Sequence, residues 1–346
     1  MAPERMRVVE LAACGGPEVL VAATRPVPEP APGQLLVRVG AVGVCGHDLL
    51  ARRGLLAARP GSVLGHEIAG EVVGLGAGTP PGWVGRRVAL VQRIPCGTCE
   101  WCADGRTTSC RSGPGFYGED LPGGYAQYVV ASPLNAVPLP DHVDLATGAI
   151  LSCAVGTGRR ALRAAEVGAG DVVVVTGAGG GVGVHTVALA HHLGAVVVAL
   201  TGSPGKVDAL RALGADRVLA RADVREVRAA LAELGRPRGA DAAVEITGGP
   251  TFTTALRALA PRGRLALVGN TEPAALPLDP GLTIVKELRV HGSAHADRDD
   301  LAAVVDLVAA GAVAPVATVR RPLAEAAAAH ADLEARAVTG RTVLLP

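Results

Sequence analysis

The pattern of apolar positions changes character near residue 155. Before that point, short β-branched segments are separated by glycine and proline, and helical periodicity is weak. Such segments are typical of strands joined by tight turns. We therefore predict a β-rich first part, with strands at 35-LLVRVGAVGV-44, 68-IAGEVVGLG-76 and 126-AQYVVA-131.

From residue 155 onward, helix-like and strand-like segments alternate. The helix-like segments are 158–168, 182–194 and 251–263, and the strand-like segments are 171–176, 195–200, 217–220, 242–246 and 264–270. Alternating βα units of this length predict a parallel sheet that is covered by helices on both faces. The tail from about residue 294 returns to a helix and short strands, with a helix expected at 323–337.

Composition limits the possible functions. The 346 residues are 49% apolar and 19% charged, with a net charge of +1, and aromatic residues make up 2%. A dispersed charge and few aromatics argue against nucleic-acid and anionic-membrane partners. The apolar runs are too short to span a bilayer, and the start lacks the features of a secretory signal. We expect a cytoplasmic protein that acts on a small molecule.

Four of the seven cysteines form one cluster. The segment 96-CGTCEWCADGRTTSC-110 contains Cys96, Cys99, Cys102 and Cys110. Four thiolates at this spacing can close a tetrahedral shell around one Zn²⁺, and a closed shell is structural rather than catalytic. Four unrelated reduced thiols and a redox switch are the alternatives.

A glycine loop lies between a predicted strand and a predicted helix, in 171-DVVVVTGAGGGVG-183. Gly177, Gly180 and Gly183 give G-x-x-G-x-x-G, which departs by one residue from the usual dinucleotide motif. The loop, with Gly181 and Val182, offers backbone amides and a helix N-terminus to a pyrophosphate. A simple tight turn is the alternative, but the repeated βα units favour dinucleotide binding.

The end of the second strand of this part indicates which dinucleotide is bound. An NAD-binding fold usually places an acidic residue there to bind the ribose 2′-hydroxyl. Here Thr201 takes that place, and Ser203 and Lys206 follow. The sequence therefore favours NADP(H), whose 2′-phosphate these residues could bind. A solvated turn with a surface lysine is the alternative.

Together these motifs resemble the medium-chain dehydrogenase/reductase superfamily, in its zinc-containing alcohol dehydrogenase family. The resemblance covers nearly the whole chain and rests on 65-GHE-67, the four-cysteine lobe, 152-SCAVGTG-158 and the glycine loop. It implies a catalytic zinc bound by Cys45, His66 and Cys153. This ligand set leaves one open position, as catalytic zinc sites do.

The resemblance also implies roles for neighbouring residues. Asp48 would orient the ligand histidine, and Glu67 would lie beside the metal. Arg341 matches an arginine that some members place on the cofactor pyrophosphate; a surface arginine is the alternative.

His47 departs from the family pattern. It stands where the family usually has a serine or threonine that passes the substrate proton, and imidazole can shuttle protons near neutral pH. We expect His47 to relay protons; a pocket-shaping role is the alternative.

The sequence predicts a two-domain α/β enzyme. A β-rich, chaperonin-10-like (GroES-like) catalytic domain would comprise residues 1–153 and 294–346, and a Rossmann domain with a doubly wound parallel sheet residues 154–293. The expected reaction is hydride transfer between NADP(H) and an alcohol/carbonyl pair, with two zinc ions per chain and a homodimer or homotetramer as the assembly. The sequence does not identify the substrate or the physiological direction.

A second activity within the same superfamily is the main alternative. The stretches 117-YGEDLPGGYAQ-127, 151-LSCAVGTG-158 and 177-GAGGGVGVH-185 are similar to acryloyl-CoA-type enoyl-thioester reductases. The alternative function is therefore an NADPH-dependent enoyl-thioester reductase or a quinone reductase of the same superfamily. A non-enzymatic relative would be expected to lack a zinc ligand or the glycine loop, and neither is missing.

Overall fold

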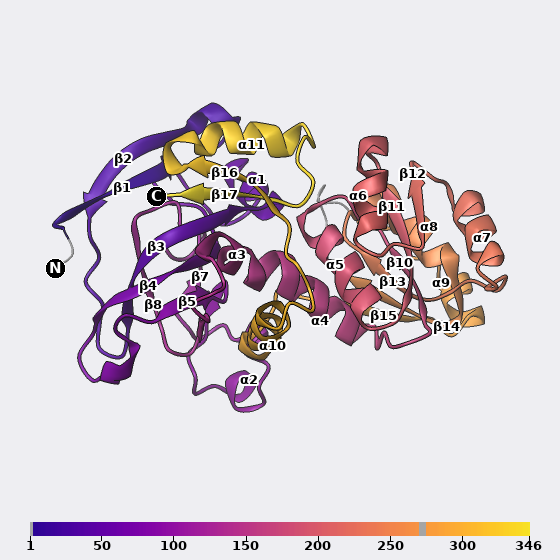
Figure 1. Ribbon diagram of the computed structural model, residues 1–346, viewed down its shortest axis with the longest axis horizontal. Coiled ribbons are helices and arrows are strands. Elements are labelled where there is room, and N and C mark those ends of the chain that lie inside the picture. The colour runs from indigo at the N-terminus through magenta and orange to yellow at the C-terminus, as the bar shows by residue number, and fades with distance from the viewer. Residues whose placement is uncertain (1–2, 270–274) are drawn as a thin grey trace. The chain divides into compact units, whose positions relative to one another are not determined.

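The computed structural model describes residues 3–269 and 275–346, and its chain divides into two units. Unit 1 comprises Met1–Gly156, His295–Gly311 and Ala317–Pro346, and unit 2 comprises Thr157–Ala294 and Ala312–Val316. The zinc ligands expected from the sequence all belong to unit 1, and the glycine loop belongs to unit 2 (Figure 1).

Unit 2 is built on a six-stranded sheet in the order β12-β11-β10-β13-β14-β15, in which all neighbouring strands are parallel. This is the doubly wound Rossmann order, and it confirms the predicted fold class. The direction of winding reverses between β10 and β13, and ligands of such sheets bind outside the carboxyl ends of the strands at this point. The strands are β10 (Val172–Val175), β11 (Val196–Thr201), β12 (Arg217–Ala220), β13 (Ala240–Glu245), β14 (Leu259–Leu267) and β15 (Arg289–Gly292).

Helices cover both faces of this sheet. The chain moves from the sheet centre first towards β12 and then towards β15. Because crossovers between parallel strands are right-handed, α5 and α6 lie on one face of the sheet and α8 and α9 on the other (Figure 1). The all-apolar strand β10 suits this doubly covered position, and its four valines are buried. The helices are α4 (Gly156–Ala164), α5 (Gly181–His192), α6 (Val207–Ala212), α7 (Val224–Glu233), α8 (Gly249–Ala258) and α9 (Pro280–Val285).

The helices of unit 2 differ from the prediction in two ways: one predicted helix is too long, and some observed helices were not predicted. The helix expected at 251–263 ends at Ala258, because Pro261 cannot continue a helix and disfavours helical backbone before it. Helices α6, α7 and α9 were not predicted. The start of α7 carries a clear signal, because Asp223 and Glu226 form a reciprocal capping box. Residue 270, the last of the predicted strand 264–270, lies outside the described residues.

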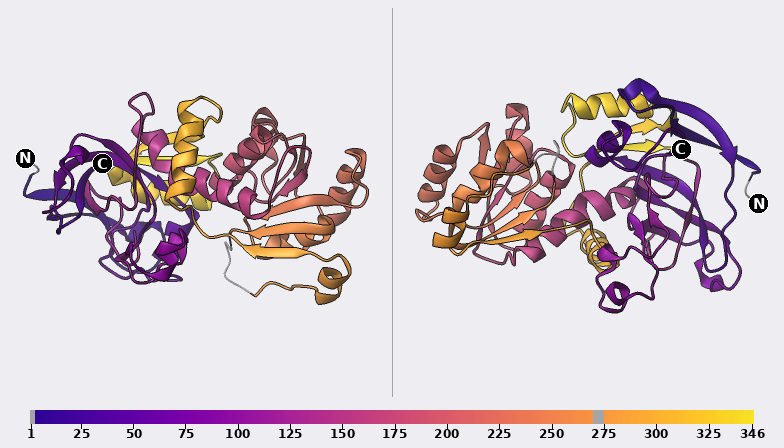
Figure 2. Two further views of the ribbon diagram at one scale, coloured as in Figure 1. Left: turned by 90° about the horizontal axis from the view of Figure 1, so that it is seen from below. Right: turned by 180° about the vertical axis from the view of Figure 1, so that it is seen from behind.

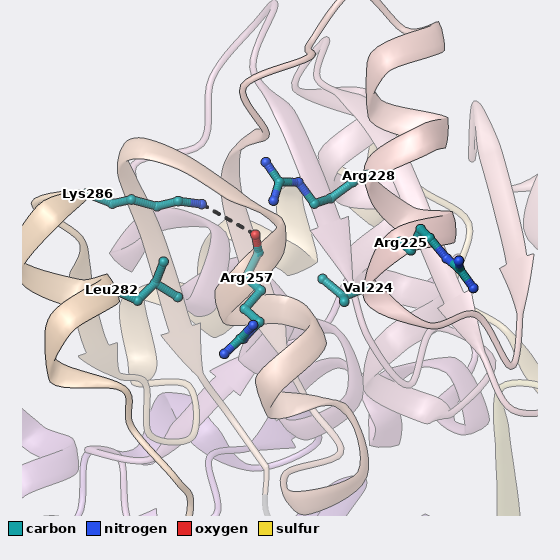
Figure 3. A pocket seen from close by; sticks show the side chains of 6 residues that line it. All are labelled: Val224, Arg225, Arg228, Arg257, Leu282 and Lys286. Atoms are coloured by element: carbon teal, nitrogen blue, oxygen red, sulfur yellow. Dashed lines mark hydrogen bonds between the residues drawn. The ribbon is translucent and has the colours of Figure 1, made fainter.

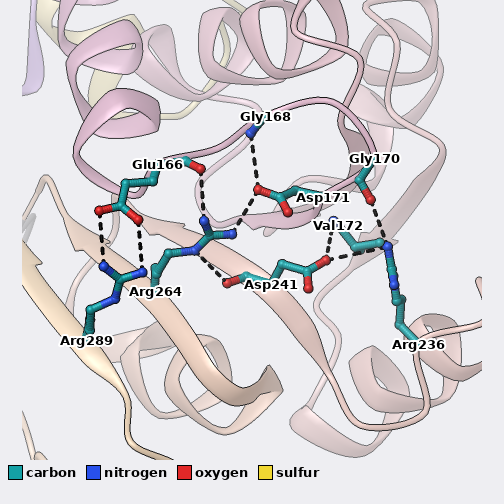
Figure 4. Close-up of polar contacts among 9 residues, drawn as sticks. All are labelled: Glu166, Gly168, Gly170, Asp171, Val172, Arg236, Asp241, Arg264 and Arg289. Carbon is teal, nitrogen blue, oxygen red and sulfur yellow. Dashed lines mark hydrogen bonds and ion pairs between the residues drawn. The ribbon is translucent and has the colours of Figure 1, made fainter.

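Ion pairs and hydrogen bonds join neighbouring strands of unit 2 at the end of the sheet where the parallel strands begin (Figure 4). Arg264 contacts Asp171 at 2.8 Å and donates to the carbonyl oxygen of Glu166, whose carboxylate pairs with Arg289 at 2.9 Å. Asp241 accepts from the backbone N–H of Val172 at 2.8 Å. These contacts tie four neighbouring strands, β10, β13, β14 and β15, together at the end of the sheet opposite the glycine loop, so they are structural.

Unit 1 contains a mixed seven-stranded sheet, with β16-β17-β3-β4-β5-β9 in sequence across it and β8 paired with β3. Strand β17 runs beside β3 (Figures 1 and 2) and pairs with it antiparallel. In this register Thr342 lies opposite Val44. The C-terminal strand is thereby brought beside the cysteine that follows β3. The strands are β3 (Leu35–Val44), β4 (Glu67–Leu75), β5 (Arg87–Leu90), β8 (Tyr128–Ala131), β9 (Ala136–Pro138), β16 (Ala317–Pro322) and β17 (Arg341–Leu345).

Two short ribbons and five helices complete unit 1. The ribbons pair β1 (Arg5–Leu11) with β2 (Leu20–Pro26), and β6 (Arg93–Ile94) with β7 (Gly115–Phe116). The helices are α1 (Gly46–Arg52), α2 (Glu100–Ala103), α3 (Leu145–Ile150), α10 (Arg298–Ala309) and α11 (Ala326–Glu334). Over the described residues, every helix is too short or too polar to cross a membrane.

Candidate active site

Helix α1 and its N-cap position Cys45, His47 and Asp48. Cys45 is its N-cap in extended backbone, and Asp48 in the first turn accepts from the Cys45 backbone N–H at 2.9 Å. This capping contact fixes the direction in which Cys45 leaves β3. It also buries Asp48, which is 1% exposed.

Cys45, His66, Glu67 and Cys153 converge in one buried cluster. Their potential ligand atoms all lie within 4.8 Å of one another. The four residues come from the end of β3, the start of β4 and a π-helical turn at Leu151–Val155. π-helical turns often lie at functional sites, and here the turn presents Cys153 to the cluster.

The sulfur separation fits a tetrahedral metal site. Zn–S bonds of about 2.3 Å at a tetrahedral angle place two sulfurs about 3.8 Å apart. The Sγ atoms of Cys45 and Cys153 are 3.8 Å apart. A hydrogen bond from the Cys153 thiol holds the pKa of Cys45 well below its ordinary value, so one thiolate is already favoured. The predicted ligand set therefore has the spacing and the donor chemistry that zinc requires.

Asp48 contacts His66, the histidine expected to bind zinc. Its Oδ1 lies 3.1 Å from His66 Nδ1, which assigns the proton to Nδ1 and leaves Nε2 as the metal-binding atom. Burial opposes the charged carboxylate, but the adjacent His66 ring lowers the pKa of Asp48 below its usual value. The structure thus brings together the two residues that the resemblance paired.

Glu67, a member of this cluster, forms a buried ion pair with Arg341. The Arg341 Nη2 and Glu67 Oε1 atoms are 2.8 Å apart, and the two side chains are 4% and 0% exposed. Burial raises the pKa of Glu67 to about 7, although Arg341 opposes this shift. Within the described residues Glu67 Oε2 has no hydrogen-bond partner, which fits a carboxylate that can approach a metal. Arg341 is therefore not the surface residue of the alternative interpretation; its contact with a pyrophosphate stays a prediction.

His47 is held by a residue that the sequence analysis did not select. Its Nε2 lies 2.5 Å from Glu119 Oε1, and its ring packs against Phe116 and His66 with centroids 5.1 and 5.0 Å away. The His47 side chain is 34% exposed. A hydrogen bond from His47 lowers the pKa of Glu119. An imidazole that touches both a ligand histidine and a carboxylate near solvent is suited to move a proton.

The four-cysteine lobe closes around a common centre. The Sγ atoms of Cys96 and Cys99 lie 3.9 and 3.6 Å from that of Cys102, close to the tetrahedral separation. Backbone N–H groups of Thr98 and Cys99 donate to Cys96 Sγ and lower the pKa of Cys96 to about 6. The four donors, completed by Cys110, fit one structural zinc.

The glycine loop leads from β10 into α5 at the switch point of the sheet. Gly177 has φ +57°, and a Cβ on Gly183 would lie 2.3 Å from the Gly177 carbonyl oxygen. Gly180 is the N-cap, and Gly181 and Val182 open the helix. Glycine is thus required for the close approach of loop and helix, and α5 begins directly after the loop, as in folds that bind a pyrophosphate at a helix N-terminus.

Comparison with known proteins agrees with this geometry. Residues 31–141 match the family model for the alcohol dehydrogenase GroES-like domain, and residues 181–310 match that for zinc-binding dehydrogenases. The chain belongs to the zinc-containing alcohol dehydrogenase family of the medium-chain dehydrogenase/reductase superfamily.

Relatives of this chain include proteins named for two different activities. An acryloyl-coenzyme A reductase from Metallosphaera sedula is 32% identical over 84% of this chain and 85% of its own length. An NAD-dependent alcohol dehydrogenase from Sulfolobus acidocaldarius is 33% identical over 92% and 94%. Among solved structures, AibC has a TM-score of 0.92 and 41% identity, covering 99% of this chain and 96% of its own.

The end of β11 lies beside the glycine loop. Lys206 is buried, and its Nζ donates to the Gly179 carbonyl oxygen at 3.1 Å. A Cβ on Gly179 would lie 3.0 Å from Thr201 Oγ1, so both side chains support the loop. Ser203 is half-buried and donates its backbone N–H to Thr201 Oγ1. The Lys206 ammonium is thus already engaged at the loop, which a simple surface lysine would not be.

Glu245 is a further residue of the cofactor crevice that the sequence analysis missed. It ends β13 beside Thr176 and is fully buried. Its Oε1 accepts from the Thr176 and Thr251 hydroxyls and from the backbone N–H groups of Thr247 and Gly248, at 2.7–2.9 Å. These bonds join the strand before the glycine loop to the start of α8. The signal in the sequence is a glutamate at the end of β13, after three apolar residues, Ala242–Val244.

Proposed function

We propose that the protein is a zinc-dependent oxidoreductase that transfers a hydride between NADP(H) and an alcohol/carbonyl pair. The observation that carries this proposal is the buried convergence of Cys45, His66 and Cys153, with two sulfurs at the spacing of tetrahedral zinc. Zinc held by these three residues would supply Lewis-acid polarisation of a substrate oxygen. The nicotinamide supplies the hydride chemistry when it is bound.

The protein's own residues hold and move the proton. Asp48 keeps the proton of His66 on Nδ1, so that Nε2 faces the sulfurs. His47, in contact with His66 and Glu119, takes the place of the family hydroxyl and passes the alcohol proton outward. Glu119 stabilises the imidazolium that forms when His47 accepts this proton.

The preference for NADP(H) is the finer part of the proposal. It is supported by Thr201, which leaves the end of β11 without the carboxylate that would repel a 2′-phosphate. Relatives of this chain are named NAD-dependent, so direct measurement of affinity is the test. A charge-assisted phosphate contact is worth about 1.5–3 kcal/mol, so NADPH should bind roughly 10–100-fold more tightly than NADH. Thr201→Asp should reverse the order, while equal or tighter binding of NADH by the unmodified protein would refute the preference.

Reduction of an enoyl thioester is the second candidate. It is favoured by the acryloyl-coenzyme A reductases among the relatives, at 32% and 30% identity, and by the absence of the usual hydroxyl at position 47. Such a reaction delivers the hydride to an activated C=C bond.

A single panel separates the two candidates. NADPH oxidation is measured with aldehydes, ketones, quinones and enoyl-CoA thioesters, using enzyme whose zinc content is known. Turnover with aldehydes or ketones supports the proposed function. Turnover confined to enoyl thioesters, and unchanged in a zinc-depleted Cys153→Ala variant, would replace it with the second candidate.

A further inference from the structure

A pocket of unit 2 is lined mainly by basic side chains and has no part in the proposed reaction. Its volume is about 330 Å³, which lies within the ~300–1,000 Å³ typical of small-molecule sites. Helices α7, α8 and α9 supply its walls (Figure 3). The lining residues are Val224, Arg225, Arg228, Arg257, Leu282 and Lys286.

Two of the cations face each other across the pocket. Figure 3 shows the Arg228 side chain reaching from α7 towards the ammonium of Lys286. Lys286 is the C-cap residue of α9. Burial lowers the pKa of Lys286, and the charge of Arg228 lowers it further. The two groups therefore repel one another, and no carboxylate in the described part of the chain pairs with either.

Lys286 is held in place by carbonyl groups instead of a carboxylate. Its Nζ donates to the backbone oxygens of Leu259 and, at 3.4 Å, Arg257. An ammonium has three N–H donors, so one remains for a ligand. The cation is thus fixed in position without being neutralised.

The other two cations are partly compensated. Arg257 lies 3.7 Å from Asp279, and Arg225 lies 4.0 Å from Asp223. The Arg225 side chain is 90% exposed and extends away from the pocket in Figure 3. The uncompensated charge is therefore that of Arg228 and Lys286, about two positive charges beside the half-buried side chains of Val224 and Leu282.

We propose that this pocket binds a phosphomonoester that carries a small apolar or aromatic group. A phosphomonoester has a charge near −2 at neutral pH and three acceptor oxygens, which match one guanidinium and one ammonium. A carboxylate would neutralise only one of the two cations. The apolar group would rest against Val224 and Leu282.

Titration calorimetry with phenyl phosphate at constant ionic strength tests the proposal. The protein is first saturated with NADP⁺, so that the dinucleotide site is filled. One binding event per chain is expected, and Arg228→Gln and Lys286→Gln should each weaken it about tenfold or more. Arg211→Gln is the matched control, because Arg211 is an exposed arginine on α6 that pairs with Asp208 and does not line the pocket.

Two further measurements make the outcome decisive. Leu282→Ala should weaken phenyl phosphate more than inorganic phosphate, because only the former uses the apolar wall. Arg228 is exposed, so its variant should keep the unmodified melting temperature even if Lys286→Gln does not. Equal affinities in Arg228→Gln and Arg211→Gln, or the lack of saturable binding in the unmodified protein, would overturn the proposal.

Discussion

His330 should make unit 1 sensitive to mild acid. The residue lies in α11, is fully buried, and contacts Arg52 from α1 and Tyr125. Arg52 can only donate, so His330 Nδ1 accepts from Arg52 Nη1 at 3.3 Å, and Nε2–H donates to the Tyr125 hydroxyl at 2.8 Å. Only the neutral ring can make both contacts, and burial lowers the pKa of His330 to about 4.

The size and sign of the effect follow from this pKa. In the unfolded chain the pKa is about 6.5, so the unfolded state takes up a proton before the folded state does. The contribution of His330 to stability is complete above pH 6.5 and is lost as the pH falls from 6.5 towards 4. Between pH 7.5 and pH 5 the loss is about 2 kcal/mol, and it reaches about 3 kcal/mol below pH 4.

Urea unfolding of the unmodified protein and of His330→Gln measures this loss. Trp83 and Trp101 both belong to unit 1, so tryptophan fluorescence reports the unit that contains His330. Glutamine can accept from Arg52 and donate to Tyr125 but does not titrate. The variant should be less stable at pH 7.5, and the difference between the two proteins should shrink by about 2 kcal/mol at pH 5.

Loss of metal in acid does not affect the comparison, because it is common to both proteins. If the free energies of unfolding of the two proteins decrease in parallel between pH 7.5 and pH 5, the assignment of a buried neutral imidazole is wrong. A difference that widens in acid would contradict it more strongly.

Three other predictions concern the metal sites, the proton and the cofactor crevice. Elemental analysis should find two zinc ions per chain. Cys153→Ala should lose one zinc and the activity but keep the fold, and Cys99→Ala should lower the melting temperature. Cys14 is exposed, so Cys14→Ala should change neither the zinc content nor the melting temperature. His47→Ala, with its zinc retained, should lower the rate of alcohol oxidation about 10²–10⁴-fold, and added imidazole should restore part of it; unchanged rates and pH profiles would reduce His47 to a pocket-shaping residue. Glu245→Ala should weaken NADPH binding and destabilise the protein by at least about 2 kcal/mol, because four donors lose their acceptor. Glu245→Gln keeps an acceptor oxygen, so its effect should be smaller. Equal effects of the two substitutions would show that the hydrogen bonds to this oxygen do not account for the stability.

Local patterns were sufficient for much of the architecture. The alternation of apolar strands and helices predicted the parallel sheet of unit 2, because a strand buried on both faces must be apolar throughout, as β10 is. The four-cysteine lobe was also readable, since its donors lie within fifteen residues of one another and one loop brings them together. Helix α7 was missed although its capping box is equally local.

Contacts between distant segments could not be read in the same way. Glu119 meets His47 across 72 residues, and His330 meets Tyr125 across 205. Neither glutamate nor histidine carries a local pattern that specifies its partner, because the partner is determined by strand pairing and helix packing. The proposed ligands of the catalytic zinc, Cys45, His66 and Cys153, were assigned by family resemblance and not by spacing.

Sequence alone therefore determined most of the strands, the fold class and the donor types. Tertiary structure decided which donors face one another and in which protonation state. The pairing of β17 with β3 places Arg341 beside Glu67, and burial then raises the pKa of that carboxyl group. The physical reason is that hydrogen-bond partners and desolvation depend on every element packed around a group, whereas apolar periodicity and capping depend only on its neighbours in the chain.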